Sequence, residues 1–252
     1  MKSIKSSYIF LLIIGACLFH SCSDEVELTD VDLRFTLTYE DAPLVGFNQF
    51  TYPLDFEVFF TKYSMYISDL KLLSDEGDYV LSEVEFIDLL TGVDTEERAQ
   101  AGQIRSFSNV PTRTYSGLSF NIGVPEELNS TAPADYPIDS PLSNNGEYWV
   151  GWTSYIFHKI EGKMDSDMDG NPEAGIALHL GSDDAFRTIN INQILELSDA
   201  SESININFDL KDILEIDGAF FDFNETPQIH HLGVLPRALP ILDNTKPVIR
   251  LD

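Results

Sequence analysis

Short segments in which polar and apolar residues alternate run through this chain from about residue 32 onward, and they limit its fold more than any other feature. Residues 32–39 (DLRFTLTY) and residues 115–124 (YSGLSFNIGV) both alternate in this way. Alternation with a period of two gives a β-strand one apolar face, and no long segment has the 3.6-residue period of an amphipathic helix. The pattern therefore predicts an all-β fold. We expect an antiparallel β-sandwich, immunoglobulin-like or jelly-roll-like, with one or two short helices.

Further strands are expected where apolar or alternating runs stand between turn-forming residues. These runs are residues 56–60, 63–72, 79–81, 84–90, 149–161, 177–181, 186–191 and 203–210. Residues 149–161 (WVGWTSYIFHKIE) are mostly apolar and predict one central strand. Residues 125–145 are rich in Pro, Ser and Asn and predict a long loop. Residues 92–103 are a loop or a short helix, and another short helix is expected at 234–242.

The composition supports a folded domain although the chain carries a formal net charge of −27. Hydrophobic residues make up 43% of the chain and aromatic residues 12%, which is enough to bury a core. Aromatic and β-branched residues also favour strands. We expect one domain over residues 31–252.

The N-terminus has the pattern of an export signal. Lys2 and Lys5 precede an uncharged apolar run at residues 8–19. That run is shorter than the roughly 20 residues that cross a bilayer as a helix, and it suits a cleaved signal. We expect residues 1–21 to be a lipoprotein signal peptide.

A cysteine stands at the end of this signal. Cys22 follows Ser21, and a small residue before a cysteine is similar to the lipobox of bacterial lipoproteins, in which the thiol is acylated. Cys17 has a similar setting but a shorter apolar core, so we favour lipidation at Cys22 and a polar tether over residues 22–30. No other cysteine occurs, and the mature chain has no disulfide framework.

Removal of the signal takes two lysines with it and changes the net charge from −27 to −29. Such a surface repels nucleic acid and anionic lipid headgroups, so the expected contact with the membrane is the lipid anchor alone. Asp24, Glu25 and Glu27 resemble the acidic signal that sends some lipoproteins to the outer face of the outer membrane. We expect an outer-membrane lipoprotein of the cell envelope, and the leaflet stays open.

Four segments in order are similar to blocks of a known family. The segments YISDLKL (66–72), YSGLSFNIGV (115–124), YIFHKIEG (155–162) and LHLG (178–181) match its YYISNIRL, YTGLSFGIGV, GYIFFKLEG and YHIG blocks. The chain therefore resembles the MbnP-like family, the methanobactin-associated copper-binding periplasmic proteins and their lipoprotein relatives. The resemblance runs from about residue 32 to the C-terminus.

The resemblance implies a β-sandwich and, in some members, a copper site. In those members a diheme peroxidase-type partner oxidises a tryptophan of a WTW element to kynurenine. Alignment on residues 155–157 puts Trp149 at the first tryptophan of that element. The second falls on Gly151, whereas Trp152 lies one residue later.

Histidines are the natural metal ligands of the mature chain, because imidazole suits copper and zinc. The copper candidates are His158, His179, His230 and His231, with Trp149 and Trp152 beside them. His158 and His179 lie on neighbouring expected strands and could face each other, and His179 also matches the family block. The alternative is that these histidines are unrelated structural residues.

A second candidate site is an acidic loop that reads D-x-D-x-D-G. Alternate carboxylates in such a loop converge on calcium, and the glycine allows the sharp turn. The calcium candidates are Asp165, Asp167, Asp169, Asn171 and Glu173. The standard loop ends in a glutamate where this chain has Ile176, so Glu173 or a residue from elsewhere would replace it. A solvated acidic turn is the alternative.

No nucleophile elbow, phosphate-binding loop, dinucleotide fingerprint or cysteine nucleophile occurs in the mature chain. The sequence therefore indicates a binding protein and not an enzyme. Two hypotheses remain: a lipid-anchored envelope protein that binds copper, or a surface lipoprotein that captures a ligand or protein partner and uses calcium for structure.

Overall fold

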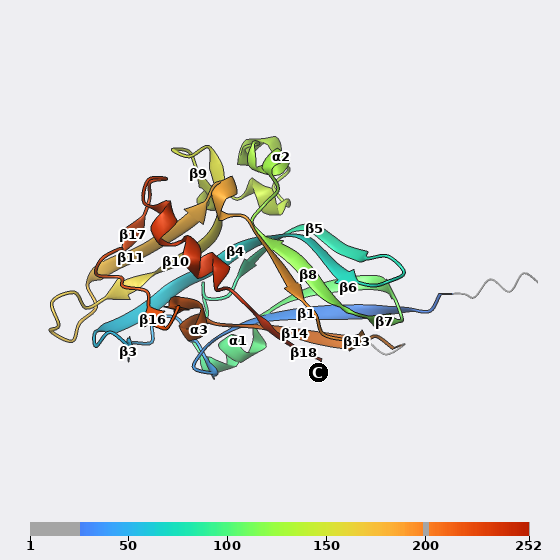
Figure 1. Ribbon diagram of the computed structural model, residues 1–252, viewed down its shortest axis with the longest axis horizontal. Helices are drawn as coiled ribbons and strands as arrows, with labels where there is room; N and C mark the ends of the chain where they lie inside the picture. The colour runs from blue at the N-terminus through green and yellow to red at the C-terminus, as the bar shows by residue number, and fades with distance from the viewer. Residues whose placement is uncertain (1–25, 199–201, 252) are drawn as a thin grey trace, which may run out of the picture.

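The computed structural model describes residues 26–198 and 202–251, which form two large sheets packed against each other (Figure 1). The expected signal peptide and Cys22 lie outside the described residues. The first sheet has the strand order β18-β14-β1-β2, with β6 also paired to β1. Its strands are β1 (Leu28–Tyr39), β2 (Ala42–Pro43), β6 (Gln103–Pro111), β14 (Glu202–Asp209) and β18 (Val248–Leu251).

The second sheet has the order β12-β8-β4-β10-β11-β17, with β3 and β5 paired to β4 and β9 paired to β10. Its strands are β3 (Phe50–Thr51), β4 (Glu57–Leu73), β5 (Tyr79–Asp88), β8 (Gly117–Ile122), β9 (Tyr148–Trp149), β10 (Ser154–Met164), β11 (Ala174–Gly181), β12 (Arg187–Ile191) and β17 (Gln228–Ile229). Two small ribbons pair β7 (Thr114–Tyr115) with β13 (Leu195–Glu196) and β15 (Glu215–Ile216) with β16 (Ala219–Phe220).

The helices are short. They are α1 (Glu96–Ala101), α2 (Glu126–Asn129), α3 (Leu210–Leu214) and α4 (Leu239–Asp243), with single 3₁₀ turns η1 (Pro133–Asp135), η2 (Pro141–Ser143), η3 (Asn145–Glu147), η4 (Asp183–Ala185) and η5 (Leu235–Arg237). The all-β prediction is confirmed, and the expected C-terminal helix corresponds to η5 and α4.

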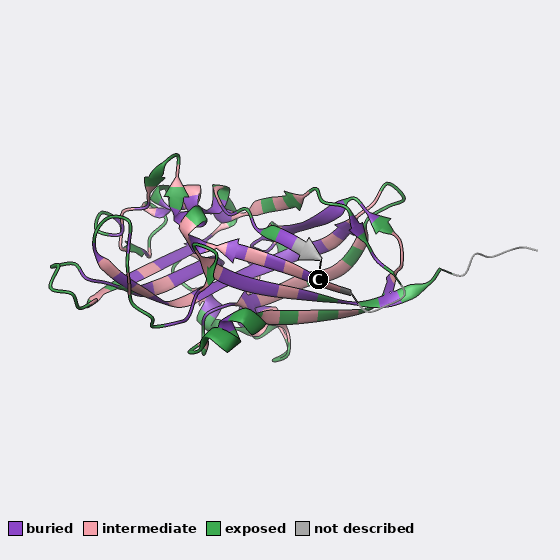
Figure 2. Ribbon diagram, turned by 90° about the horizontal axis from the view of Figure 1, so that it is seen from below, coloured by how far each residue is buried: buried purple, intermediate pink, exposed green. Residues whose placement is uncertain are grey.

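The core lies between the two sheets, where the alternating residues of β1 point inward. Val31, Leu33 and Phe35 of β1 are fully buried. The rings of Tyr63 on β4 and Phe208 on β14 are 6.2 Å apart across the interface between the sheets. Burial of each such side chain contributes about 1.5–3 kcal/mol. Figure 2 shows buried residues along the strands of both sheets and exposed residues at their loops.

The sheets are mixed, which the alternation did not predict. β1 pairs in parallel with β14, and Phe35 lies opposite Ile206. β17 pairs in parallel with Ala177 and Leu178 in the middle of β11. Residues 103–111, which were not among the expected strands, form strand β6. These pairings join segments far apart in the sequence, so local alternation carries no signal for them.

The prediction of one strand over residues 149–161 is wrong. Strand β9 ends at Trp149, and β10 begins at Ser154. The backbone N–H of Trp152 donates to Trp149 O, and Thr153 adopts a φ of 50°, so the chain makes a tight turn between the strands. This turn folds β9 back onto β10 as an antiparallel pair.

Residues 125–145 are not a free loop but a cover on the outer face of the second sheet (Figure 1). The segment contains α2 and three 3₁₀ turns with η3 at its end. Tyr66 and Tyr155 reach out of β4 and β10 and donate to the carbonyl oxygens of Pro141 and Leu142. Because of this cover, almost every residue of β10 is buried on both faces.

Candidate metal centre

Strands β10 and β11 form an antiparallel hairpin that presents three polar side chains on its outer face. His179 of β11 lies opposite Lys159 of β10, and Glu161 stands two residues further along β10. Residues separated by two on a strand share a face, so Glu161 and His179 are neighbours. The Nε2 atom of His179 is 2.7 Å from Glu161 Oε1.

The expectation that His158 faces His179 is wrong. His158 pairs with Leu180, so it points into the core, whereas His179 points out. His158 is fully buried, and its ring meets Tyr63 edge-on at 4.8 Å. Burial lowers its pKa to about 3, which keeps the imidazole neutral. Adjacent positions on a strand point to opposite faces, and this parity separates the two histidines.

His230 and Trp149 join His179 on the outer face. The rings of His179 and His230 are 4.7 Å apart. Trp149 stacks on His230 at 5.1 Å with an interplanar angle of 21°, and it meets His179 at 5.5 Å. His230 arrives there because β17, which ends one residue earlier, pairs with Ala177 and Leu178 of β11. Trp149 arrives on β9.

Two imidazole nitrogens of this cluster are buried and lack a hydrogen-bond partner among the described residues. They are Nδ1 of His179 and Nε2 of His230. The carboxylate of Glu161 accepts a hydrogen bond from Nε2–H of His179, and in this neutral tautomer Nδ1 carries a lone pair. A buried polar atom without a partner costs about 1–3 kcal/mol. Two such nitrogens, on rings whose centroids are 4.7 Å apart, suit a soft or borderline metal ion that accepts imidazole ligands.

The electrostatic environment favours a neutral imidazole at His230 and an ionised carboxylate at Glu161, the forms that support metal binding. Burial and the neighbouring His179 lower the pKa of His230, which favours the neutral imidazole. The hydrogen bond from His179 lowers the pKa of Glu161, so its carboxylate stays charged. An ionised carboxylate behind a histidine fixes the ring and raises its basicity as a ligand.

Gly151 makes room for the indole of Trp149. A Cβ atom at position 151 would lie 3.0 Å from Nε1 of Trp149, closer than ordinary contact. Trp152 packs on the other side, 5.9 Å from Trp149 between ring centroids, and lies against Gly181. The absence of a side chain at Gly151 is therefore part of how this chain positions Trp149.

His231 does not join the cluster, although it follows His230 directly. Its side chain is exposed, and its Nδ1 atom accepts a hydrogen bond from the backbone N–H of Gly233 at 2.9 Å. The contact closes a local turn. Of the candidate copper ligands, the structure thus brings together His179, His230, Trp149 and, at the rim, Trp152.

Sequence reasoning missed Glu161 and Lys159. Glutamates are too abundant in this chain for one of them to stand out, since Asp and Glu number 42. The hairpin could have pointed to these two residues. Its strands are joined by residues 165–173, so positions 159–161 lie opposite positions 177–179. Counting that register outward from the turn would have paired His179 with this part of β10.

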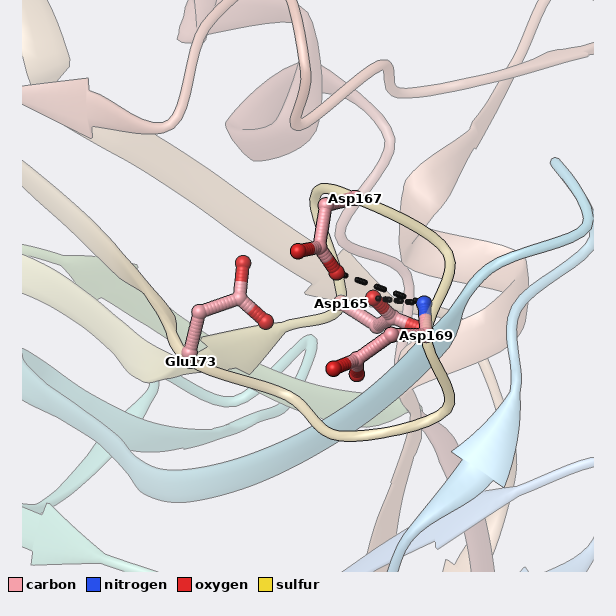
Figure 3. A group of neighbouring side chains, drawn as sticks. All are labelled: Asp165, Asp167, Asp169 and Glu173. Atoms are coloured by element: carbon pink, nitrogen blue, oxygen red, sulfur yellow. Dashed lines mark hydrogen bonds between the residues drawn. The ribbon is translucent and has the colours of Figure 1, made fainter.

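The acidic loop closes the tip of the same hairpin (Figure 3). The carboxylates of Asp165, Asp167, Asp169 and Glu173 lie within 4.8 Å of one another and could hold a metal ion. Asp165 is 3% exposed and accepts the backbone N–H groups of Asp169 at 3.1 Å and Gly170 at 2.7 Å. The other three carboxylates are exposed.

The other polar residues of the loop interact with one another and with neighbouring groups. The negative charge of Asp169 raises the pKa of Asp167, as expected for like charges in contact. Glu173 accepts from the backbone N–H and the hydroxyl of Ser166. Asn171 donates to Asp169 with its side-chain amide, so its oxygen is the ligand atom that remains. Ile176 is buried, in agreement with its apolar nature.

Comparison with known proteins identifies the family. The sequence profile of MbnP matches residues 28–231. The chain belongs to the MbnP family. A solved structure, MbnP from Methylosinus trichosporium, superposes with a TM-score of 0.55 at 12% identity and covers 90% of this chain and 99% of that chain. At this identity the likeness concerns the fold alone.

The family match agrees with the resemblance seen in the sequence blocks, and it includes the hairpin, Trp149 and His230. Among curated proteins, none matches this MbnP-family chain. In the described part of the chain, no helix is both long and apolar enough to cross a membrane.

Proposed function

We propose that this chain is a non-enzymatic envelope protein that binds copper through Nδ1 of His179 and Nε2 of His230, next to Trp149. The observation that carries the proposal is the pair of buried, unpartnered imidazole nitrogens beside one indole. Bound copper would coordinate both nitrogens, and the indole of Trp149 would line one side of the site. Copper is favoured over other imidazole-binding metals because copper binding is what the MbnP resemblance implies.

The test is copper retention by purified protein after loading and desalting. His179→Ala and His230→Ala each remove one nitrogen and should abolish retention. His231→Ala is the matched control, because His231 is exposed and turned into its own loop. Equal retention by all three variants and the unaltered protein would refute the assignment.

The resemblance also implies a partner, and we extend the proposal to it. Trp149 is the tryptophan that a diheme peroxidase-type enzyme would oxidise, since it aligns with the family position and contacts both histidines. Mass spectrometry of the peptide that contains Trp149, from protein isolated from its native cell, checks this. A modified Trp152 with intact Trp149 would contradict the alignment.

For the acidic loop we propose calcium as a structural ion. The four carboxylates lie close together, and one of them is buried and fixed by backbone N–H groups. Calcium should raise the melting temperature of the unaltered protein. Asp167→Asn should reduce that rise, whereas Asp139→Asn, an exposed acidic residue elsewhere, should keep it. A rise that survives Asp167→Asn would argue against the loop.

We further propose that acylated Cys22 holds the domain at the outer membrane. The basic and apolar start of the chain and the small residue before the cysteine support this. In labelling with a radioactive fatty acid, Cys22→Ser should lose the label and Cys17→Ser should keep it. The reverse result would move the cleavage site.

A further inference from the structure

A buried ion pair lies beside the candidate metal centre, under the cover of the second sheet. Lys159 Nζ is 2.8 Å from Glu147 Oε2, and the two side chains are 8% and 4% exposed. The ammonium donates a hydrogen bond to Gly146 O at 2.7 Å. Its contact with Glu147 Oε2 lacks hydrogen-bond geometry and is an ion pair. Burying two charges costs several kcal/mol per ion before their attraction offsets it.

This ion pair joins two parts of the candidate metal centre, the tryptophan segment and the histidine hairpin, which share only a short sheet pairing. Lys159 lies directly opposite His179 in the register of the hairpin. Glu147 is the last residue of η3 and stands two residues before Trp149. The strand that carries Trp149 is only two residues long and makes two register pairs with β10. Lys159 and Glu147 thus tie the tryptophan segment to the histidine strand.

A second lysine completes the anchor from the neighbouring strand. Lys62 of β4 is 3.4 Å from Glu147 Oε1 and 2.6 Å from Asp88 Oδ2. Both oxygens of Glu147 therefore meet ammonium groups, one from β10 and one from β4. A carboxylate held from two strands cannot shift along either of them without losing a partner in a buried setting, which is costly.

We infer that Lys159 and Glu147 are positioning residues which hold Trp149 over His179 and His230. The inference rests on the proposed copper site for its functional consequence. Its geometric part, the placement of Trp149, concerns the metal-free protein as well. A hydrophobic pair of similar volume would fill the same space, but it would leave the register of η3 and β9 free to vary.

The experiment uses a Trp152→Phe background, in which Trp149 is the single remaining tryptophan because the chain has two. Lys159→Met removes the charge and keeps the aliphatic stem. Lys163→Met is the matched control, since Lys163 is exposed on the same strand. Acrylamide quenching of the metal-free protein should show increased access to Trp149 in Lys159→Met and unchanged access in Lys163→Met. Lys159→Arg keeps the charge and should restore protection.

A copper competition titration then tests the functional part. Lys159→Met should weaken copper binding about 10-fold to 100-fold, in the range found for residues that orient metal ligands. In a Trp149→Phe background the same substitution should not weaken copper binding further, because Lys159 acts on the metal through the position of Trp149. If Lys159→Met unfolds the domain, Glu147→Gln, which leaves the loop volume unchanged, carries the same two measurements.

The outcomes separate the claims. Unchanged quenching of Trp149 in both Lys159→Met and Glu147→Gln would overturn the inference. Altered quenching with unchanged copper affinity would overturn its link to the metal. If the unaltered protein takes up no copper, the proposed function fails, while the quenching result still decides whether the ion pair positions Trp149.

Discussion

The hairpin of β10 and β11 carries both candidate metal centres, and they are built in opposite ways. At its tip, four carboxylates come from one continuous stretch, and three of them are exposed. On its outer face, His179, His230 and Trp149 come from three separate segments, and two of their nitrogens are buried without partners. The tip is a local site on a turn, whereas the face is a tertiary site.

The two sites differ in how much the folded protein is destabilised when no metal ion is bound. At the tip, water solvates the exposed carboxylates, so their mutual repulsion is small and a metal adds modest stability. On the face, the unpartnered nitrogens carry a desolvation cost, which a bound metal ion would relieve by accepting their lone pairs. We therefore expect substitutions on the outer face to change metal binding. At the tip, we expect a large loss of stability on substitution of the buried Asp165 and small changes at the exposed carboxylates.

The largest effect is expected at the buried anchor of the tip. Asp165→Ala leaves the backbone N–H groups of Asp169 and Gly170 without their charged acceptor. The unfolding free energy should fall by about 3–6 kcal/mol, since each of the two hydrogen bonds to this charged group is worth about 1.5–3 kcal/mol. Asp167→Ala, on the exposed side, should change it by less than about 0.5 kcal/mol without metal. Urea unfolding measures both, and equal losses would remove the distinction.

The next effect separates the histidine in the core from those on the face. The pKa of His158 is lowered to about 3 from an unfolded value of 6.5, so the unfolded chain binds the proton first as pH falls. Stability should therefore decline from about pH 6.5 toward pH 3, by about 2 kcal/mol at pH 5. His158→Phe should flatten this decline, with His231→Ala as an exposed control. A decline that persists unchanged in His158→Phe would assign it to other groups.

A crossed pair of glutamate variants compares the two centres directly. Glu161→Gln removes the charge behind His179 and should weaken copper binding about 10-fold to 100-fold while leaving the calcium response intact. Glu173→Gln should weaken the calcium response and leave copper affinity intact. Competition titrations for each metal in both variants provide the four values. Loss of both metals in either variant would mean that the sites are not independent.

The smallest effect is expected from a single methyl group. Gly151→Ala would place a Cβ atom 3.0 Å from Nε1 of Trp149 and push the indole by a few tenths of an ångström. We expect a few-fold loss of copper affinity, below about 1.4 kcal/mol. Gly175→Ala in the same hairpin meets no atom within 4 Å and serves as the control. Identical affinities in the two variants would show that the indole tolerates displacement.

The sequence by itself determined what is local. Alternation over residues 32–39 predicted β1 and its buried face, because a strand's side chains alternate with a fixed period. The acidic loop was visible as a continuous motif, since neighbouring residues on one turn stay together in any fold. The four family blocks also pointed to the correct family, and the profile match bears them out.

The tertiary structure alone decided which histidines meet. His158 and His179 were both candidate ligands on neighbouring expected strands, but a one-residue difference in register sends His158 into the core and His179 to the outer face. His230 reaches His179 only through the parallel pairing of β17 with β11, and Trp149 only through the turn after β9. Such pairings depend on burial summed over the whole core, so no short stretch of sequence encodes them.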